Sequence, residues 1–274
     1  MALERATDLV GDGDLSVSYE DLNRAAELFE HAGVVVFEGA PALLETAFLE
    51  QCRREFEEEF AKIEMQLRSR NVDLDKPLRF NEVVRRLRGR YDVRGLQATC
   101  LGSQRLALEN APWKDFVQLV IGEDATELWR GVVLSQYGSE EQNWHRDGGH
   151  LFENQHLPAH CVTVFVPLVA TSEEMGRTSF YPGSQVLQRS HQYNLEFKKG
   201  RPCSWLPFAT PAVDLGSWLV FDYRIVHRGC ANEDHDLKRD RPMLYFVYAK
   251  PWFTDAYNFP TDAPLFLNHG SELG

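Results

Sequence analysis

From about residue 126 onward, the sequence is a series of short apolar runs separated by turns rich in glycine, proline and serine. The runs have the length and the β-branched and aromatic content of strands, whereas Pro182-Gly183-Ser184 and similar groups are typical of turns. Many short strands that follow one another in this way favour a β-sandwich or a jelly roll. The expected strands are residues 126–136, 161–168, 178–181, 217–222 and 243–249.

The N-terminal part reads differently, because helical signals dominate it. Polar residues from Ser18 to Asp21 can cap a helix that Gly33 ends, and Val34-Val35-Val36-Phe37 follows as a buried strand. A second helix is expected from Pro41 to about Arg68, where apolar residues recur at helical spacing.

These patterns predict a mainly β protein with flanking helices. We expect a single domain over residues 1–274, in which a helical N-terminal part, about residues 15–125, packs on a jelly-roll core, about residues 126–250. The length of 274 residues and the hydrophobic content of 43% are sufficient for one large packed domain.

Composition argues against several kinds of partner and compartment. The net charge of −12 disfavours a nucleic-acid-binding protein, whose affinity depends on neutralising phosphates. No apolar run reaches the roughly 18–20 residues that span a bilayer, and the N-terminus has no signal-peptide core. We therefore expect a cytoplasmic protein without nucleic-acid or membrane partners, acting as a monomer or a homodimer. The five cysteines are scattered, which fits a reducing compartment: Cys52, Cys100, Cys161, Cys203 and Cys230.

Residues 67–95 differ from the rest of this acidic chain, because nine basic residues oppose four acidic ones there. Such a segment could attract an anionic substrate. Such a segment more often pairs with the acidic helices beside it, so attraction of an anion stays the second interpretation.

The segment Trp144-His145-Arg146-Asp147-Gly148-Gly149 places an imidazole and a carboxylate two residues apart, with glycines after them. In an extended strand, side chains at i and i+2 lie on the same face, so His145 and Asp147 can bind one ion together. His227 follows another expected strand and can supply a third ligand. Two histidines and one carboxylate on one side of a metal leave the other positions open, which suits non-haem iron(II). A zinc cluster of His150, His156 and His160 is disfavoured, because the segment has neither cysteine ligands nor an H-E-x-x-H helix pattern.

Taken together, H-x-D-G, Pro182-Gly183-Ser184, the strand that ends at Phe221-Asp222, His227 and Arg241 resemble the phytanoyl-CoA dioxygenase family of iron(II)- and 2-oxoglutarate-dependent oxygenases. The resemblance covers about residues 126–250. It implies a double-stranded β-helix, a cupin-like jelly roll, that uses iron(II), 2-oxoglutarate and O₂, with ascorbate as an accessory reductant. The residues that it implies are His145, Asp147 and His227 as iron ligands and Arg241, Thr163 and Gln142 as 2-oxoglutarate residues, with Thr163 beside the carboxylate that Arg241 binds.

Two departures from the family pattern bear on this assignment. The interval between His227 and Arg241 is about three residues longer than is usual, so Arg239 is the alternative anchor for 2-oxoglutarate. Gln185 occupies a position where many members have a histidine that shapes the pocket. Asp147 itself disfavours halogenation, because related halogenases have a small residue at this position.

The resemblance implies an oxidoreductase that hydroxylates a small organic metabolite and releases succinate and CO₂. Desaturation, epoxidation and cyclisation would use the same residues. Two functions of a different class compete with these reactions: a jelly-roll binding protein that has lost turnover, and a jelly-roll metalloenzyme that uses no 2-oxoglutarate. Whether the substrate is a coenzyme A thioester stays open at this stage.

Overall fold

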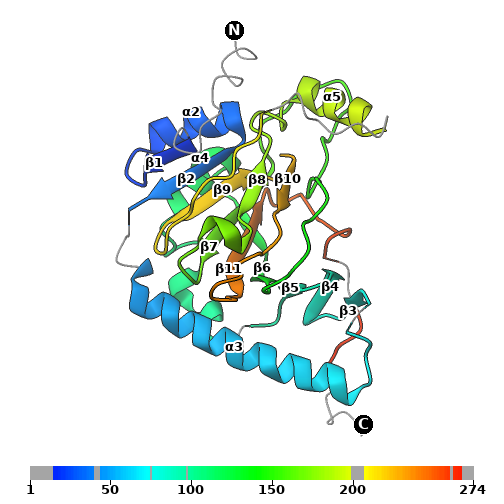
Figure 1. Ribbon diagram of the computed structural model, residues 1–274. Helices are drawn as coiled ribbons and strands as arrows, with labels where there is room; N and C mark the ends of the chain where they lie inside the picture. Colours follow the sequence, from blue (N-terminus) through cyan, green and yellow to red (C-terminus); the bar gives the residue numbers. More distant parts are fainter. Residues whose placement is uncertain are drawn as a thin grey trace, which may run out of the picture.

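The computed structural model describes residues 15–39, 44–74, 76–96, 98–198, 207–259 and 262–266. A nine-stranded sheet forms the main layer, in the order β1-β2-β9-β7-β11-β6-β5-β4-β3, and a two-stranded sheet, β10-β8, lies against it (Figure 1). The strands are β1 (Ser16–Ser18), β2 (Val34–Glu38), β3 (Leu78–Arg79), β4 (Val83–Leu87), β5 (Arg90–Val93), β6 (Thr126–Ser135), β7 (Cys161–Pro167), β8 (Thr178–Phe180), β9 (Trp218–Asp222), β10 (His227–Gly229) and β11 (Arg241–Ala249).

The smaller sheet is wider than its two strands, because isolated bridges extend it on both edges. His145 pairs antiparallel with His227 on β10, and Ala209 pairs with Phe180 on β8. Two mostly antiparallel layers that face each other with a cavity between them are the expected jelly roll, so the predicted fold class is confirmed. All five strands expected after residue 126 are present, with ends within two residues of the expected ones.

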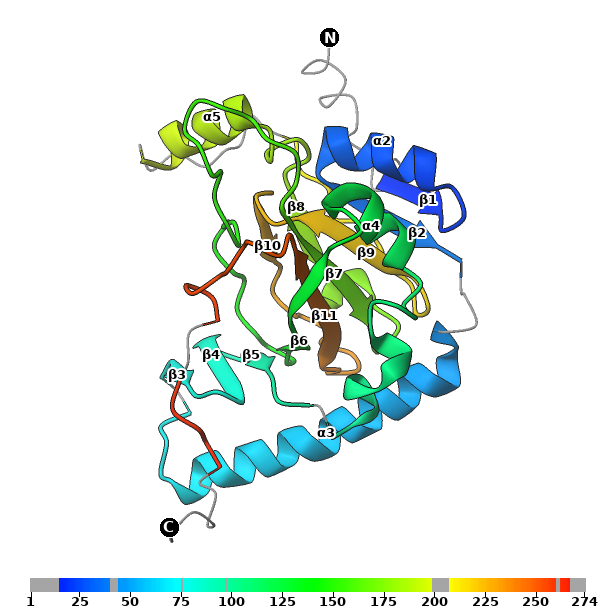
Figure 2. The same ribbon diagram turned by 180° about the vertical axis from the view of Figure 1, so that it is seen from behind.

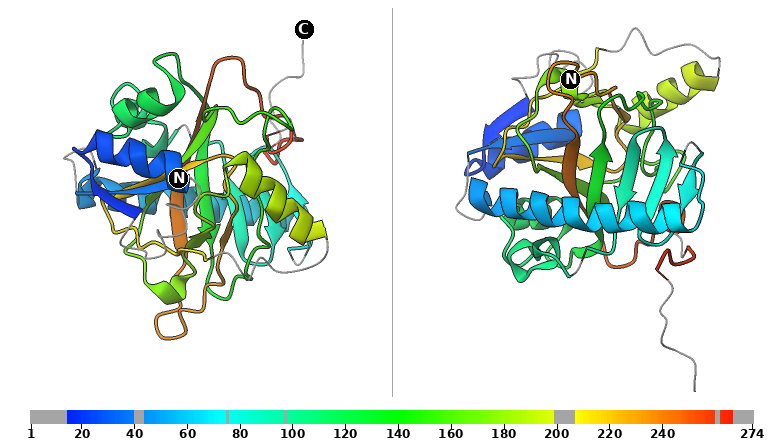
Figure 3. Two further views of the ribbon diagram at one scale, coloured as in Figure 1. Left: turned by 90° about the horizontal axis from the view of Figure 1, so that it is seen from above. Right: turned by 60° about the horizontal axis from the view of Figure 1, so that its bottom comes forward.

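Three of the described α-helices cover one face of the main sheet, and the fourth packs beside the smaller sheet. The α-helices are α2 (Leu22–Ala32), α3 (Thr46–Ser69), α4 (Lys114–Ile121) and α5 (Leu187–Lys198), and short 3₁₀ turns are η3 (Cys100–Gly102), η4 (Gln104–Leu106) and η5 (Glu173–Met175). In the view from behind, α2 and α4 lie over the β2–β9 end of the sheet (Figure 2), and the long α3 runs across the strands from β11 to β4 (Figure 3, right). Residues of α5 pack against the smaller sheet instead.

Side chains alternate along each strand, and this alternation separates the core from the cavity. On β11, Leu244, Phe246 and Tyr248 belong to the large apolar cluster under the helices. The intervening Tyr245 and Val247 face the other layer and line the cavity. This is the period-two pattern of a sheet whose faces meet different neighbours.

The two N-terminal helices are confirmed, with a later start for the second. Asp21 caps α2 by accepting a hydrogen bond from the Arg24 amide (3.1 Å), and Gly33 ends it in the left-handed conformation. The α3 helix begins at Thr46, and the expected start at Pro41 lies outside the described residues.

The helices expected in the N-terminal part are present, and strands that the sequence did not predict accompany them: β1, β3, β4 and β5. Together with β2, which was expected, they extend the main sheet at both edges. The hairpins β3–β4–β5 escape sequence analysis because the strands are two to five residues long and rich in arginine. Charged side chains at alternate positions lower the apolar signal on which strand prediction depends.

No helix among the described residues is both long enough and apolar enough to cross a membrane.

Candidate metal centre and its pocket

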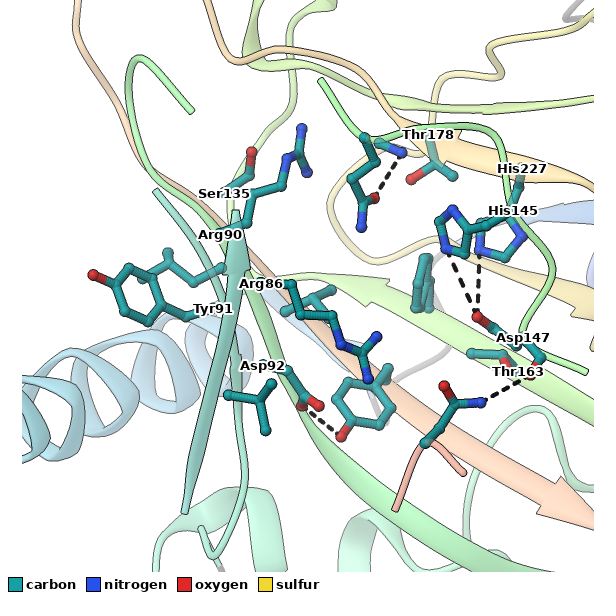
Figure 4. Close-up of a pocket in the computed structure, with 18 of the residues that line it drawn as sticks. Arg86, Arg90, Tyr91, Asp92, Ser135, His145, Asp147, Thr163, Thr178 and His227 are labelled. Carbon is teal, nitrogen blue, oxygen red and sulfur yellow. Dashed lines mark hydrogen bonds and ion pairs between the residues drawn. The ribbon is translucent and has the colours of Figure 1, made fainter. Parts of the chain in front are cut away.

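The three candidate metal ligands meet at one end of the cavity between the sheets. The Asp147 Oδ1 atom lies 3.9 Å from His145 Nε2 and 3.8 Å from His227 Nε2, and ligand atoms of all three residues lie within 4.8 Å of one another (Figure 4). Among the described residues this is the one group of histidine, cysteine and acidic side chains with such spacing.

Backbone pairing brings the two histidines together. The His145 amide donates to the His227 carbonyl (3.0 Å), and the His227 amide donates to the His145 carbonyl (2.9 Å). Each Nδ1 lies at a carbonyl oxygen, of Asn143 (2.8 Å) or of Ile225 (3.1 Å). Because Nδ1 donates the proton in both rings, Nε2 keeps the lone pair that a metal ion needs.

The electrostatic environment favours a neutral His227 ring. The pKa of His227 is lowered to about 4 by burial, an effect that Asp147 opposes and His145 reinforces. A neutral imidazole is the form that binds metal ions.

The loop that carries Asp147 is held from two sides. The Gly148 amide donates to the Tyr223 carbonyl (2.9 Å), and a Cβ at Gly148 would approach the Tyr223 ring to 2.6 Å, so glycine is required here. From the C-terminal segment, Asn258 Nδ2 donates to the Asp147 carbonyl (2.8 Å) and to Asp255 (2.8 Å). Sequence analysis missed Asn258, because no motif signals a contact between residues 111 positions apart.

Replacing Asn258 with alanine is expected to weaken metal binding about tenfold without unfolding the protein. The substitution frees the loop that carries Asp147 but removes no ligand, and supporting residues of metal sites typically contribute about 10- to 100-fold. The measurement is the dissociation constant for iron(II) under anaerobic conditions. Tyr257→Ala, an 86% exposed neighbour, is the control. Equal metal affinity in both variants would show that Asn258 does not position Asp147.

Arg241 is buried in the wall of the same cavity. It is 4% exposed, its Nε donates to the Met175 carbonyl (3.1 Å), and no described carboxylate forms an ion pair with it. Burial first, and then the nearby Arg90, lower the pKa of Arg241 to about 10. A buried guanidinium without an acidic partner is suited to binding an anion that enters the cavity.

The alternative anchor, Arg239, lies elsewhere. Its Nε donates to Asp234 Oδ2 (2.8 Å), its side chain is 40% exposed, and it does not line the cavity. The extra residues between His227 and Arg241 form an exposed turn before β11, which Asn232 holds by donating to the Arg239 carbonyl (2.9 Å). The insertion therefore leaves Arg241 at the first position of the strand.

Arg90 was not identified from the sequence. It projects from β5 into the cavity, where it donates to the carbonyl oxygens of Glu140 and Cys230. Burial lowers its pKa to about 10. Gly229 gives it room, because a Cβ there would lie 2.5 Å from Arg90 Nη1 and 2.8 Å from Gln142 Oε1. Two buried arginines therefore contribute to the cavity wall.

The placement of Thr163 requires a correction. It is 3% exposed and lines the cavity, and its hydroxyl has no hydrogen-bond partner among the described residues. However, it pairs with Val247, six residues along β11 from Arg241, and lies beside Asp147 (Figure 4). Thr163 thus lies near the metal ligands and not at the Arg241 end of the strand. The hydroxyl opposite Arg241 belongs to Ser135 on β6.

Gln142 lines the cavity as expected, but its side chain has a structural partner. Its Oε1 accepts from the Gly229 amide (2.8 Å), and its backbone amide donates to the Gly229 carbonyl (2.9 Å). Gln185 does not line the cavity. Its Nε2 donates to the Glu30 carbonyl (3.1 Å), so it fixes the Pro-Gly-Ser turn to the end of α2.

His150, His156 and His160 do not form a metal site with one another. His160 is 3% exposed and packs against Trp252 and Phe253. Burial, and secondarily Arg224, lower its pKa to about 4.

This buried ring predicts a loss of stability in acid. The unfolded chain binds a proton at His160 below pH 6.5, whereas the folded state binds it only near pH 4. The free energy of unfolding therefore falls between those values, by about 3 kcal/mol for this group. His160→Phe is expected to reduce this pH dependence in urea titrations at pH 7, 6 and 5. His191→Phe on the exposed face of α5 should leave it unchanged, and equal slopes in the two variants would contradict the assignment.

We expected the basic segment 67–95 to pair with the acidic helices, but no ion pair joins them among the residues that the structure describes. Arg79 binds Asp262 (2.8 Å) and Arg94 binds Asp92 on its own strand. Arg86, Arg90 and Arg94 line the cavity. The second interpretation of this segment, attraction of an anion, thus regains support.

The donor set suits an iron(II) ion. Two imidazole nitrogens and a carboxylate oxygen, all within 4.8 Å of one another, are the donors of a two-histidine, one-carboxylate iron site. The cavity beside these donors is open to solvent, so small molecules can enter it.

Comparison with known proteins agrees with this geometry. The model of the family "Phytanoyl-CoA dioxygenase (PhyH)" matches residues 29–239. Among similar solved structures, the non-heme alpha ketoglutarate dependent epimerase SnoN from nogalamycin biosynthesis is 20% identical (TM-score 0.54, 84% of each chain covered). The carbocyclase SnoK from the same biosynthesis is 16% identical, with a TM-score of 0.58 and 86% of this chain and 87% of that chain covered. HygX from Streptomyces hygroscopicus, solved with nickel and 2-oxoglutarate bound, is 15% identical, with a TM-score of 0.53 and 87% of this chain and 94% of that chain covered.

Proposed function

The chain belongs to the phytanoyl-CoA dioxygenase family, and from this we propose that it is an iron(II)- and 2-oxoglutarate-dependent oxygenase that acts on a small organic metabolite. The observation that carries the proposal is the cavity itself. Two histidines and a carboxylate converge on it, and a buried arginine without an acidic partner among the described residues lines its wall. The similar structures described with alpha ketoglutarate or with nickel and 2-oxoglutarate support the same cofactor set.

His145, Asp147 and His227 would hold the iron. Their three donor atoms lie on one side of the site, which leaves positions for further ligands on the cavity side. Iron(II) bound there would supply the chemistry that side chains lack, the activation of O₂ at the expense of 2-oxoglutarate, which leaves as succinate and CO₂.

The protein groups orient the cosubstrate and exclude water. We assign the distal carboxylate of 2-oxoglutarate to the guanidinium of Arg241, with Ser135 on the paired strand beside it. Arg90 adds a second positive charge, since Arg241 and Arg90 are close enough to lower the pKa of Arg241. Because both groups are desolvated, their hydrogen bonds to an anion are stronger than they would be in water.

Hydroxylation is the reaction that we propose first. An epimerase and a carbocyclase occur among the similar structures, so desaturation, epoxidation and cyclisation stay as alternatives on the same residues. Asp147 argues against halogenation, because its carboxylate occupies the position that a halide would need. A protein that has lost turnover is the weaker candidate, since the metal ligands and Arg241 are all present.

The test is succinate formation by purified protein with iron(II), 2-oxoglutarate, O₂ and ascorbate. We expect slow succinate release without substrate, faster release with the correct substrate, and none after His145→Ala. A wild-type protein that binds iron but neither binds nor consumes 2-oxoglutarate would contradict the proposal and favour a metalloenzyme that uses no 2-oxoglutarate.

A further inference from the structure

The cavity carries an excess of positive charge. Four arginines line it, Arg86, Arg90, Arg94 and Arg241, against two aspartates, Asp92 and Asp147. The two positive charges of bound iron(II) and the two negative charges of 2-oxoglutarate would cancel each other. The side chains of the cavity would therefore still have an excess of two positive charges. This occurs in a chain whose net charge is −12, so the excess is a property of the cavity and not of the protein as a whole.

Three of these arginines have partners or an assigned role. Arg94 binds Asp92 and donates to the Asn258 carbonyl (3.2 Å). Arg90 donates to two carbonyl oxygens, and Arg241 is assigned to 2-oxoglutarate. The side chain of Arg86 has no hydrogen bond, ion pair or ring contact with any described residue.

Strand alternation places Arg86 on the cavity face. Val84, two residues earlier on β4, lines the cavity as well, whereas Arg85 between them is buried on the opposite face, against the Tyr91 ring. Arg85 pairs with Tyr91 and Leu87 pairs with Arg90, so Arg86 is also the extra residue of a β-bulge. The Arg86 side chain is exposed, and Figure 4 shows it reaching from the strand into the space that Asp147 and the two histidines face.

Apolar and polar side chains share the remaining wall. Phe165, Val247 and Phe259 line the cavity, and Tyr245 presents its ring there while its hydroxyl donates to Asp92 (2.7 Å). The polar lining residues are Ser135, Gln142, Thr163, Thr178 and Asn258. The apolar groups, together with the Arg86 guanidinium, suit a molecule that has an apolar body and an anionic end.

We propose that Arg86 binds a carboxylate or phosphate group of the organic substrate, and hence that the substrate is an acid with an apolar body. This inference rests on the proposed function, because it assumes that 2-oxoglutarate occupies the Arg241 end. The role of Arg86 is to select and position the substrate.

The experiment uses full-length protein loaded with zinc(II), a redox-inert substitute for iron, and saturated with 2-oxoglutarate. Matched compounds with one apolar body, such as a phenylalkyl chain, end in a carboxylate, a phosphate monoester, a primary amide or a primary amine. Dissociation constants are measured by calorimetry for wild type, Arg86→Gln and Arg88→Gln. Arg88 lies two residues further along the same hairpin and is exposed like Arg86, but it does not line the cavity, so it is a charge-matched control.

In wild type and Arg88→Gln, an acid should bind at least about tenfold more tightly than its amide, and the carboxylate and phosphate series show which anion fits better. Arg86→Gln should abolish this difference while its dissociation constant for 2-oxoglutarate equals that of wild type. The proposal is wrong if no acid is preferred over its amide, if Arg86→Gln keeps the preference, or if the acids displace 2-oxoglutarate. Failure of wild type to bind 2-oxoglutarate would instead contradict the proposed function.

Discussion

Asp147→Ala is expected to abolish succinate formation, with a loss of at least about 100-fold, and to lower the iron content of the purified protein. The substitution removes the oxygen atom that lies within 3.9 Å of both histidine Nε2 atoms. Two neutral imidazoles alone bind iron(II) weakly, because the hard cation prefers an anionic oxygen in its ligand set. Metal analysis and a coupled succinate assay measure the two effects separately.

The matched control is Asp236→Ala, which removes an exposed carboxylate from the turn before β11. It should retain wild-type iron content and turnover. If Asp147→Ala keeps its iron and its activity, the metal lies elsewhere and the site assignment fails. If the variant is unfolded by circular dichroism, Asp147→Asn, which keeps the size of the side chain, gives the same test.

Arg241→Gln is expected to weaken 2-oxoglutarate binding at least about 100-fold while iron binding stays unchanged. A buried guanidinium that meets a carboxylate forms charge-assisted hydrogen bonds that glutamine cannot replace. The measurement is calorimetric titration of 2-oxoglutarate into zinc-loaded protein. Arg239→Gln, which lies outside the cavity, should bind 2-oxoglutarate as wild type does, and a loss in that variant instead would make Arg239 the anchor.

Arg241→Gln is also expected to leave the ligand-free protein at least as stable as wild type, although it weakens 2-oxoglutarate binding. Without 2-oxoglutarate, Arg241 is a buried charge with no acidic partner among the described residues, so its replacement leaves no carboxylate unpaired. The melting temperature of the ligand-free Arg241→Gln protein should therefore equal or exceed that of wild type. Addition of 2-oxoglutarate should raise the melting temperature of wild type alone. A variant that is strongly destabilised without ligand would indicate that Arg241 is a structural residue.

The sequence predicted the metal ligands because their signals are local. His145 and Asp147 share a face through strand periodicity, and His227 directly follows β9 and a short turn. The strands after residue 126 could also be predicted, because turn residues flank each of them. What the sequence could not supply was the register between strands. It placed Thr163 beside Arg241, whereas the pairing of β7 with β11 separates the two by six residues.

The residues that sequence analysis missed make contacts with distant parts of the chain or lie on strands whose charged side chains obscure the alternation of apolar residues. Asn258 supports Asp147 from the C-terminal segment, and Arg90 lies on a strand four residues long. Neither has a motif. Gln185, which the resemblance placed at the pocket, packs against the end of α2 instead, because its amide finds backbone carbonyls there.

The edge position of the β3–β5 hairpins has a consequence for how this protein can change. The metal ligands come from the smaller sheet and its flanking loop, whereas Arg86 and Asp92 come from edge strands that contact the main sheet only through β6. Arg86 on β4 is thus supplied by a different element from the metal ligands, whereas Arg90 on β5 lies close to Arg241. Substitutions on β4 are therefore expected to change substrate choice while the metal ligands stay in place, and a graft of β4 between relatives is the direct way to transfer a substrate preference.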